Sequence, residues 1–390
     1  MTRPIYLDYL STTPVDPEVV EAMVKCLDHE GTFGNPASRS HRFGWEADMA
    51  VETARQQVAE LINADIREIV WTSGATEADN LAVKGVIDAE LGNSDSEGSP
   101  HVVTSAIEHK AVLDSCHALE QRGIEVSYAP PDARGLVTSD AVAAAMRPNT
   151  RLVSVMHANN EIGTINDIAA IAEVAHDAGA LLHVDAAQTI GKIPVDVQHL
   201  DADLVSMSAH KFYGPKGVGA LYVRRRPGAT LRAQIHGGGH ERGMRAGTLA
   251  THQLVGMGQA AALAQRKLSS ESERLRNLRD QLWDSVSSID GVTLNGDPSF
   301  RLPGALNISV ARVDGEALML ALSEFALSTG SACTSESLEP SYVLRAIGLP
   351  DALAHSSLRI SLGRYTSETD VGLFIDRFHE VVPRLRRDAA

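Results

Sequence analysis

The chain has 390 residues, 44% hydrophobic and 22% charged, a composition typical of a globular protein that buries a large core in two or three domains. No segment approaches about 18 consecutive apolar residues, and charges come too early at the N-terminus for a signal peptide. We therefore expect a cytoplasmic protein without a membrane span. The net charge of −15 argues against direct nucleic-acid binding, because phosphates would be repelled. Three cysteines, an odd number, argue against a disulfide framework.

Short apolar strand patterns alternate with helical ones through the first 223 residues. The patterns predict strands at 68–72, 101–105, 125–128, 151–156, 181–185, 203–207 and 218–223, and helices at 75–90, 109–122, 139–146 and 167–178. This alternation predicts an α/β fold with a mostly parallel, buried sheet and helices on both faces. Ligands of such sheets bind beyond the carboxyl ends of the strands.

The pattern of apolar residues changes near Thr251, where two long helices are expected at 251–266 and 270–289. A strand at 306–310, a helix near 316–323 and a strand at 357–362 follow. We divide the chain into a segment at 1–15 that packs with the small domain, a large domain at 16–261 and a small α/β domain at 262–390. The active site is then expected between the two domains.

Two apolar runs end on complementary charges. The run that begins at Ala180 ends on Asp185, and the run that begins at Asp203 ends on Lys211, before a Gly-Pro turn. A pyridoxal phosphate enzyme needs a lysine that forms a Schiff base with the cofactor and a carboxylate that pairs with its ring nitrogen. The plain alternatives are a surface lysine before a turn and an aspartate that caps a helix. Lys110 also follows a histidine, but it opens a helical pattern, so Lys211 is favoured.

The stretch Ser73-Gly-Ala-Thr-Glu77 follows a predicted strand and opens a helix, whose free backbone N–H groups can bind a phosphate together with the Thr76 hydroxyl. A plain capping box by Ser73 or Thr76 explains the spacing equally well. Ser208 and His210 are further candidate phosphate donors by their proximity to Lys211. His236 and His240 flank three glycines that disfavour a helix, so we reject a metal site there.

The three cysteines lie in different contexts. Cys26 and Cys116 fall at apolar positions of helical patterns and are predicted to be core thiols, whereas Cys333 lies in a polar stretch, Ser328-Thr-Gly-Ser-Ala-Cys-Thr-Ser335. A loop thiol can act as a nucleophile when it is exposed and near positive charge, and an incidental loop cysteine is the alternative. Arg359, inside an alternating strand pattern, is either solvated or clamps a carboxylate.

Ten motifs together resemble cysteine desulfurases of the IscS/NifS type, class V members of the pyridoxal phosphate enzymes of fold type I. They are Leu7-Asp-Tyr, Gly34-Asn-Pro-Ala-Ser-Arg-Ser-His41, Ser73-Gly-Ala-Thr-Glu77, Glu108-His-Lys110, Asn159-Asn-Glu-Ile-Gly163, His183-Val-Asp-Ala-Ala-Gln188, Ser208-Ala-His-Lys-Phe-Tyr-Gly-Pro-Lys-Gly217, His236-Gly-Gly-Gly-His-Glu-Arg-Gly243, Arg245-Ala-Gly-Thr248 and Gly330-Ser-Ala-Cys-Thr-Ser335. The resemblance runs from residue 4 to about 365. It implies an aspartate aminotransferase-like large domain with a smaller C-terminal domain.

The resemblance also implies roles for single residues. Lys211 would carry the cofactor, Asp185 would pair with its ring nitrogen, and His109 would stack on the ring and act as acid or base. The implied phosphate ligands are Ala75, Thr76, Ser208, His210 and, from the second subunit of a homodimer, Thr248. Gln188 would meet the phenolic oxygen, Asn160 would contact cofactor and substrate, and Arg359 would clamp the substrate carboxylate. Cys333 would bear the persulfide.

The implied reaction converts L-cysteine to L-alanine and passes sulfur to acceptor proteins, such as an iron–sulfur scaffold or a tRNA-thiolation relay protein. Two departures stand out: Leu10-Ser11 replaces the usual small residues, and the chain ends at Ala390 without the extended tail that helps relatives dock a scaffold. The alternatives are a selenocysteine lyase or aminotransferase, which needs no loop thiol, and a cofactor-free Cys-His hydrolase.

Overall fold

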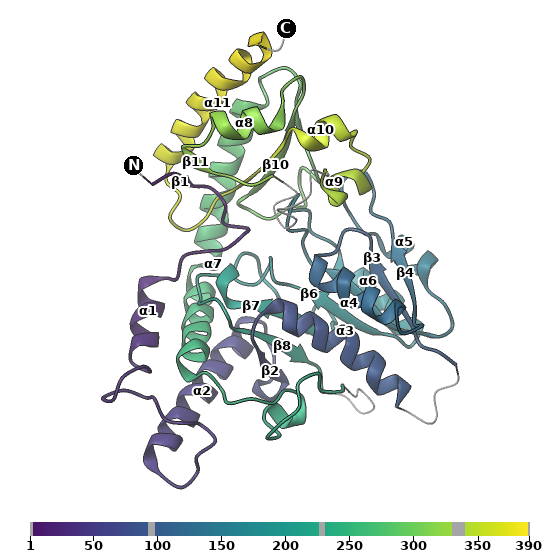
Figure 1. Cartoon of the computed structure of the whole chain (residues 1–390), viewed down its shortest axis with the longest axis vertical. Helices are drawn as coiled ribbons and strands as arrows, with labels where there is room; N and C mark the ends of the chain where they lie inside the picture. The colour runs from purple at the N-terminus through teal and green to yellow at the C-terminus, as the bar shows by residue number, and fades with distance from the viewer. Residues whose placement is uncertain (1–2, 93–97, 226–230, 330–339, 389–390) are drawn as a thin grey trace.

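A computed structural model describes residues 3–92, 98–225, 231–329 and 340–388 (Figure 1). Its centre is a seven-stranded sheet with the strand order β2-β8-β7-β6-β5-β3-β4. The strands are β2 (Ile69–Thr72), β3 (His101–Ser105), β4 (Glu125–Ala129), β5 (Thr150–Met156), β6 (Leu181–Asp185), β7 (Leu204–Ser208) and β8 (Gly219–Val223). All seven predicted strands are confirmed within one or two residues. Only β8 runs antiparallel to its neighbours, β2 and β7.

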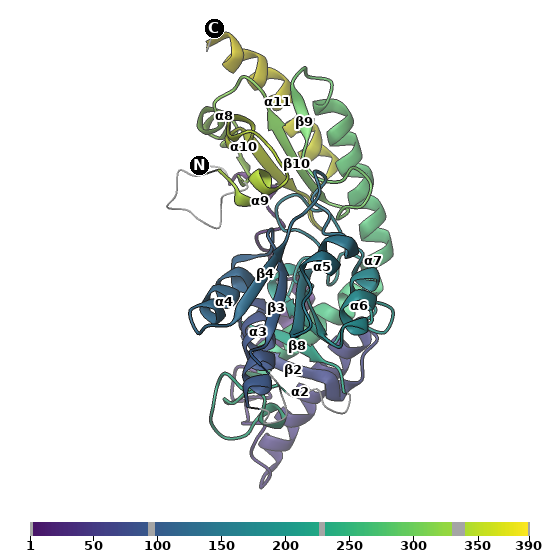
Figure 2. The same cartoon turned by 90° about the vertical axis from the view of Figure 1, so that its right-hand side faces the viewer.

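Helices cover both faces of this sheet, as the alternating pattern predicted (Figure 2). They include α3 (Ala75–Leu91) and α4 (Lys110–Glu120) on one face, and α5 (Ser139–Ala145) and α6 (Ile168–Asp177) on the other. Successive strand residues point to opposite faces. Thus Val102 packs in the cluster beneath α3 and α4, and Val103 packs in the cluster on the other face.

One helix, α7 (Thr251–Val286), runs for 36 residues where the sequence predicted two helices. The two predicted helices leave residues 267–269 between them. Serine lowers helix propensity only slightly, and no glycine or proline lies between Gln259 and Asp290 to end the helix. The N-terminal half of α7 packs against α1 (Pro17–Val24) and α2 (Arg42–Leu61).

The C-terminal part contains a second sheet and a second core. Its sheet has the order β12-β10-β9, from β9 (Val292–Leu294), β10 (Ala305–Val310) and β12 (Ser357–Ser361), all antiparallel. The helices are α8 (Gly315–Ala321), α9 (Tyr342–Ala346), α10 (Asp351–His355) and α11 (Glu368–Asp388). The second half of α7 contributes Leu278 and Leu282 to this core.

The N-terminal segment returns to the C-terminal part of the chain. Strand β1 (Ile5–Tyr6) pairs in parallel with β11 (Phe325–Ala326), and Leu7 is buried in the second core. Short 3₁₀ turns lie at Ile66–Glu68, Ala209–Lys211 and Glu241–Gly243. The division of the chain at residues 15 and 261 stays a prediction. Among the described helices, none combines the length and apolar character that crossing a bilayer requires.

Candidate active site

An open cavity of about 470 Å³ lies at the carboxyl ends of β6 and β7. Ten of the twelve site residues predicted from the sequence line it: Ala75, Thr76, His109, Asn160, Asp185, Gln188, Ser208, His210, Lys211 and Arg359. Strands β6 and β7 are parallel neighbours, so their ends bring Asp185 and the turn that carries Lys211 to the same sheet edge. The N-terminal end of α3, which follows β2 in the chain, closes one side of the cavity.

Lys211 lies one 3₁₀ turn beyond β7 and does not end the strand itself, which corrects the sequence prediction. The Gly-Pro turn that follows holds this 3₁₀ turn, since Gly214 donates its N–H to the carbonyl of Ala209. The Lys211 Nζ donates to the backbone carbonyls of Leu10 at 2.6 Å and Ser11 at 2.9 Å. The amine is therefore oriented by neutral acceptors from the N-terminal segment.

Asp185 ends β6 and is 7% exposed. One carboxylate oxygen accepts the N–H of Ala187 at 2.9 Å, but the residues that follow form turns and no helix, so the alternative prediction of a helix-capping aspartate is wrong. Burial raises the pKa of Asp185, and the nearby imidazole of His109 lowers it. A cationic partner such as a protonated ring nitrogen would stabilise the carboxylate here.

His109 caps helix α4 and lines the cavity. Its Nδ1 accepts the N–H of Ala111 at 3.1 Å, so the neutral ring carries its proton on Nε2. Burial lowers the pKa of His109, which favours this neutral form. The ring is thus a hydrogen-bond donor with a fixed tautomer.

The N-terminus of α3 opens into the cavity without a side-chain cap. Its N-cap is Gly74, so the predicted alternative of capping by Ser73 or Thr76 is wrong. Glu77 also lines the cavity, but its carboxylate accepts the N–H of Ser73 and forms an ion pair with Arg245 at 2.8 Å. The unsatisfied N–H groups of this 17-residue helix, with Ser208 and His210 opposite, form a setting suited to a phosphate.

Arg359 on β12 reaches into the same cavity. The Arg359 side chain is 4% exposed, so the alternative of a solvated arginine does not hold. Its Nη1 donates to the carbonyl of Asn160 at 3.0 Å. Neither Arg359 Nε nor Asn160 Oδ1 has a hydrogen-bond partner among the described residues. Buried polar atoms of this kind are costly unless a ligand satisfies them. A donor and an acceptor are thus available for a substrate.

Sequence reasoning missed several cavity residues. The carbonyls of Leu10 and Ser11 hold Lys211, although the sequence offered Leu10-Ser11 only as a local departure from a motif. Asp79 of α3 and Lys216 also line the cavity. Helical spacing gave Asp79 no distinctive signal, because one polar residue in a helix is ordinary.

Two predicted site residues lie elsewhere. Thr248 is exposed and does not line the cavity within one chain. Cys333 lies outside the described residues, but residues on both sides of its segment are described. Ser328 exchanges two backbone hydrogen bonds with Arg359, and the Ser341 hydroxyl donates to the Glu161 carboxylate at 2.5 Å. One flank therefore contacts the cavity residue Arg359, and the other contacts Glu161, which follows the cavity residue Asn160 in the chain.

The two other thiols are buried and unpaired with each other. Cys116 is fully buried in α4, and burial raises its pKa to about 12. Cys26 is also buried, as predicted, although it lies two residues beyond the end of α1 rather than inside the helix. Burial raises the pKa of Cys26 as well. Both are unsuited to nucleophilic attack.

Comparison with known proteins decides the family. A family model described as aminotransferase class V matches residues 5–374. Two curated relatives, each named cysteine desulfurase IscS, come from Aeromonas hydrophila subsp. hydrophila and Stutzerimonas stutzeri. Each is 58% identical over 386 residues, which is 99% of this chain and 94% of the relative. This chain belongs to the class V aminotransferases and, within them, to the cysteine desulfurases.

Solved structures agree with this assignment. A NIFS-like protein superimposes on the desulfurase with a TM-score of 0.89 at 36% identity, covering 98% of this chain and 100% of the other. SspA in complex with cysteine has a TM-score of 0.82 at 38% identity, covering 93% and 100%. The predicted resemblance and the fold-type I architecture are confirmed, and the family depends on pyridoxal phosphate.

The cavity of the desulfurase fits that cofactor. An amine, a buried carboxylate and an uncapped helix N-terminus face one space, which matches an aldehyde, a ring nitrogen and a phosphate. The glycine at position 74 is required there, because its φ of +152° is one that other residues rarely adopt. Backbone can therefore approach a ligand closely at this point.

Proposed function

We propose that this desulfurase converts L-cysteine to L-alanine with pyridoxal phosphate in the cavity, leaving the sulfur as a persulfide on Cys333. The observation that carries the proposal is the shared cavity of Lys211, Asp185 and the uncapped α3 N-terminus. No other described arrangement in the chain offers an amine, an acid and a phosphate-binding helix end together. The family assignment supports the same reaction.

The residues that would hold the cofactor divide by its chemical groups. Lys211 would tether the aldehyde, Asp185 would pair with the ring nitrogen, and Gln188 would meet the phenolic oxygen. The proposed phosphate ligands are Ala75, Thr76, Ser208 and His210, with Thr248 of a second subunit. When bound, the cofactor supplies an electron sink for the carbanion formed at the substrate Cα.

Arg359 and Asn160 would orient the substrate. The guanidinium would bind the α-carboxylate through its unsatisfied Nε, and Asn160 Oδ1 would accept a hydrogen bond from the bound substrate. Lys211, displaced from its tether, would take the proton from the substrate Cα at Nζ. His109, with its proton on Nε2, would donate to or accept from the reacting substrate.

Cys333 would complete the sulfur transfer. Its thiolate attacks the substrate sulfur, so an S–S bond forms while the substrate Cβ–S bond breaks and Cβ gains a proton. Cysteine and the enzyme thiol thus become alanine and an enzyme persulfide, with no outside oxidant or reductant. The buried Cys26 and Cys116 cannot substitute, because burial raises the pKa of each thiol.

The wider setting is part of the same proposal. We infer a cytoplasmic homodimer, in which Thr248 of each subunit completes the partner's phosphate site. SspA binds cysteine in its solved complex, which supports L-cysteine as the substrate here. The IscS relatives support sulfur delivery to acceptor proteins for iron–sulfur assembly, and tRNA thiolation is a second outlet.

The decisive experiment combines covalent mapping with a thiol variant. Borohydride reduction of the holoenzyme followed by peptide mapping is expected to give a pyridoxyl adduct at Lys211. Cys333→Ser is expected to keep the cofactor absorbance and lose alanine formation from cysteine, whereas Cys26→Ser is expected to retain it. An adduct elsewhere, or undiminished persulfide formation by Cys333→Ser, overturns the proposal. Amino transfer to a keto acid would instead identify an aminotransferase.

A further inference from the structure

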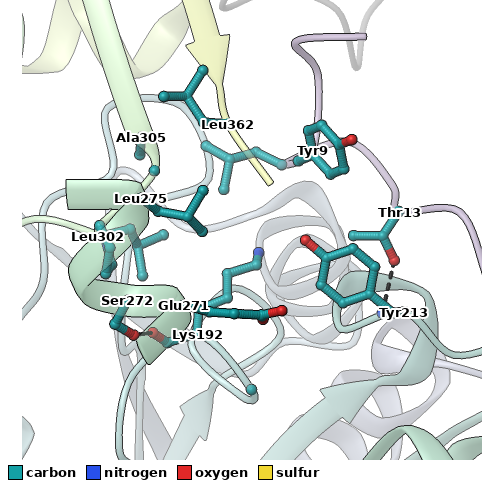
Figure 3. A pocket seen from close by; sticks show the side chains of 14 residues that line it. Tyr9, Thr13, Lys192, Tyr213, Glu271, Ser272, Leu275, Leu302, Ala305 and Leu362 are labelled. Carbon is teal, nitrogen blue, oxygen red and sulfur yellow. Dashed lines mark hydrogen bonds between the residues drawn. The ribbon is translucent and has the colours of Figure 1, made fainter. Parts of the chain in front are cut away.

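A second, narrower cavity lies directly behind the active site, between the large sheet and the C-terminal part of the chain. It is lined by Tyr9, Leu10, Lys192, Tyr213, Glu271 and Leu275, among others. Figure 3 shows the Lys192 side chain extending into it, with the nitrogen directed toward the space between Leu275 and Tyr213. The cavity is narrow, with room for a few water molecules.

The backbone presents Lys192 to this cavity in a fixed way. Gly191 before it has a φ of +73°, and a Cβ there would come within 2.7 Å of the Phe212 side chain, so the turn depends on glycine. The Lys192 carbonyl accepts the Ser272 hydroxyl of α7 at 2.6 Å. The lysine is thus held between the end of β6 and the long helix.

The ammonium group of Lys192 has a neutral partner in place of a carboxylate. Its Nζ donates to Gln188 Oε1 at 2.8 Å, and no carboxylate of the described residues lies within 4.0 Å of it. Glu271 lines the same cavity, but its two oxygens are occupied by Arg364 at 2.5 and 3.2 Å. Lys192 is partly buried, and a cation without a counter-ion is costly in such a place, so a functional reason is expected.

This contact fixes which way the Gln188 amide faces. Because Oε1 accepts from Lys192, the amide NH₂ must lie on the other side, where Nε2 donates to the Leu10 carbonyl at 3.0 Å. The same carbonyl accepts the Lys211 amine at 2.6 Å. Gln188 lines the active-site cavity, so its second N–H is available there as a donor.

We propose that Lys192 is a positioning residue that locks the Gln188 amide with its NH₂ toward the cofactor's phenolic oxygen and so lowers the pKa of the Lys211–cofactor linkage. The inference rests on the proposed function, which places that oxygen near Gln188. A donor to the phenolate stabilises its negative charge and competes with its hydrogen bond to the protonated linkage.

Charged groups near Lys192 affect its own protonation. Burial lowers the pKa of Lys192, and the positive charges of Lys211 and Arg359 lower it further. The other titratable or charged side chains around the cavity are Tyr9, Tyr213, Glu271 and Arg364. Burial raises the pKa of both tyrosines, so they stay neutral, and Glu271 is paired with Arg364.

The test is an absorbance titration of the resting holoenzyme with no substrate present. In Lys192→Met the pH midpoint of the cofactor band is expected to rise by about one unit, a tenfold change in proton affinity. Lys192→Arg, which keeps the charge and a donor, is expected to return the midpoint toward that of the unmodified enzyme. Leu275→Met changes the same cavity without polar contacts and is expected to leave the midpoint in place.

A double-mutant cycle separates positioning from a direct field. If Lys192 acts through the amide, Gln188→Leu alone raises the midpoint, and adding Lys192→Met raises it by less than in the unmodified background. An unchanged midpoint in Lys192→Met with normal cofactor binding overturns this inference and leaves the proposed function intact. Full additivity of the two substitutions also overturns it. Absence of a cofactor band in the unmodified protein overturns both.

Discussion

Arg359 Nη2 lies 2.9 Å from a carboxylate oxygen of Asp8, although 351 positions separate the two residues in the sequence. The same nitrogen donates to the Ser11 hydroxyl at 2.7 Å. The guanidinium of β12 is therefore oriented by the N-terminal segment, which also holds the Lys211 amine. One short segment sets the relative positions of the proposed substrate clamp and the proposed cofactor lysine.

We expect Arg359→Lys to raise the KM for L-cysteine by about 10- to 100-fold, because an ammonium cannot contact Asp8, Ser11 and a carboxylate with the planar geometry of a guanidinium. The cofactor absorbance should be retained. Steady-state kinetics over a wide cysteine range would measure the change. An unchanged KM would show that the substrate carboxylate binds elsewhere. Arg345→Lys, on an exposed ion pair with Asp351, is the matched control.

The buried carboxyl group of Glu161 should make the folding stability of the protein depend on pH. Burial raises its pKa to about 7 from the usual 4.5, so the folded protein holds this proton more tightly than the unfolded chain. The stability that the protonated Glu161 contributes to the folded state is fully present below about pH 4.5 and is lost as the pH rises through 7. The free energy of unfolding of Glu161→Gln, measured relative to that of the unmodified protein, should rise by on the order of 1–3 kcal/mol between pH 5 and pH 8.

Thermal unfolding at the two pH values checks this prediction as a shift in midpoint of a few degrees. Glu316→Gln, at an exposed site, should show no such pH-dependent difference. A Glu161→Gln protein that becomes less stable at pH 8 than at pH 5, relative to the unmodified one, would contradict the buried, protonated carboxyl.

A buried ion pair ties the glycine-rich segment to the large sheet. Arg55 contacts Glu241 through both Nη atoms, at 2.7 and 3.0 Å, and Glu241 also accepts the Trp71 N–H. Glu241→Gln should destabilise the protein by about 3 kcal/mol, because it removes the buried carboxylate partner of Arg55 and leaves only the half-exposed Glu52. Chemical denaturation would measure the loss.

The comparison for this pair is an exposed one. Arg42 and Glu46 lie 2.6 Å apart with side chains 85% and 40% exposed, and Glu46→Gln should cost less than about 1 kcal/mol. Equal losses for Glu241→Gln and Glu46→Gln would show that the buried pair does not hold the segment in place.

Thiol labelling gives a further prediction. With Cys26 and Cys116 buried and their pKa values raised, brief iodoacetamide treatment of the native protein should modify one thiol, which maps to Cys333. The denatured chain should take up three labels. Intact mass spectrometry resolves the two cases, and rapid native labelling at Cys116 would contradict its burial.

Local patterns in the sequence predicted the strands and most helices. They also predicted that Asp185 and Lys211 lie near the ends of two neighbouring strands. Asp185 and Lys211 stood out because each follows an apolar run. The partners of Lys211 could not be predicted this way, since Leu10 and Ser11 are 200 residues away and contribute backbone carbonyls, which every residue has. Likewise, the sequence pattern predicted two helices where the structure has one, since no glycine or proline ends the helix at residues 267–269.

The unbroken length of α7 has a mechanical consequence. At 1.5 Å per residue its 36 residues extend about 54 Å, with one half packed in each hydrophobic core. A continuous helix has no joint, so the two cores cannot swing apart without bending it. The long helix therefore keeps Arg359 of β12 and Lys211, in the 3₁₀ turn beyond β7, at a fixed separation while substrate enters and product leaves.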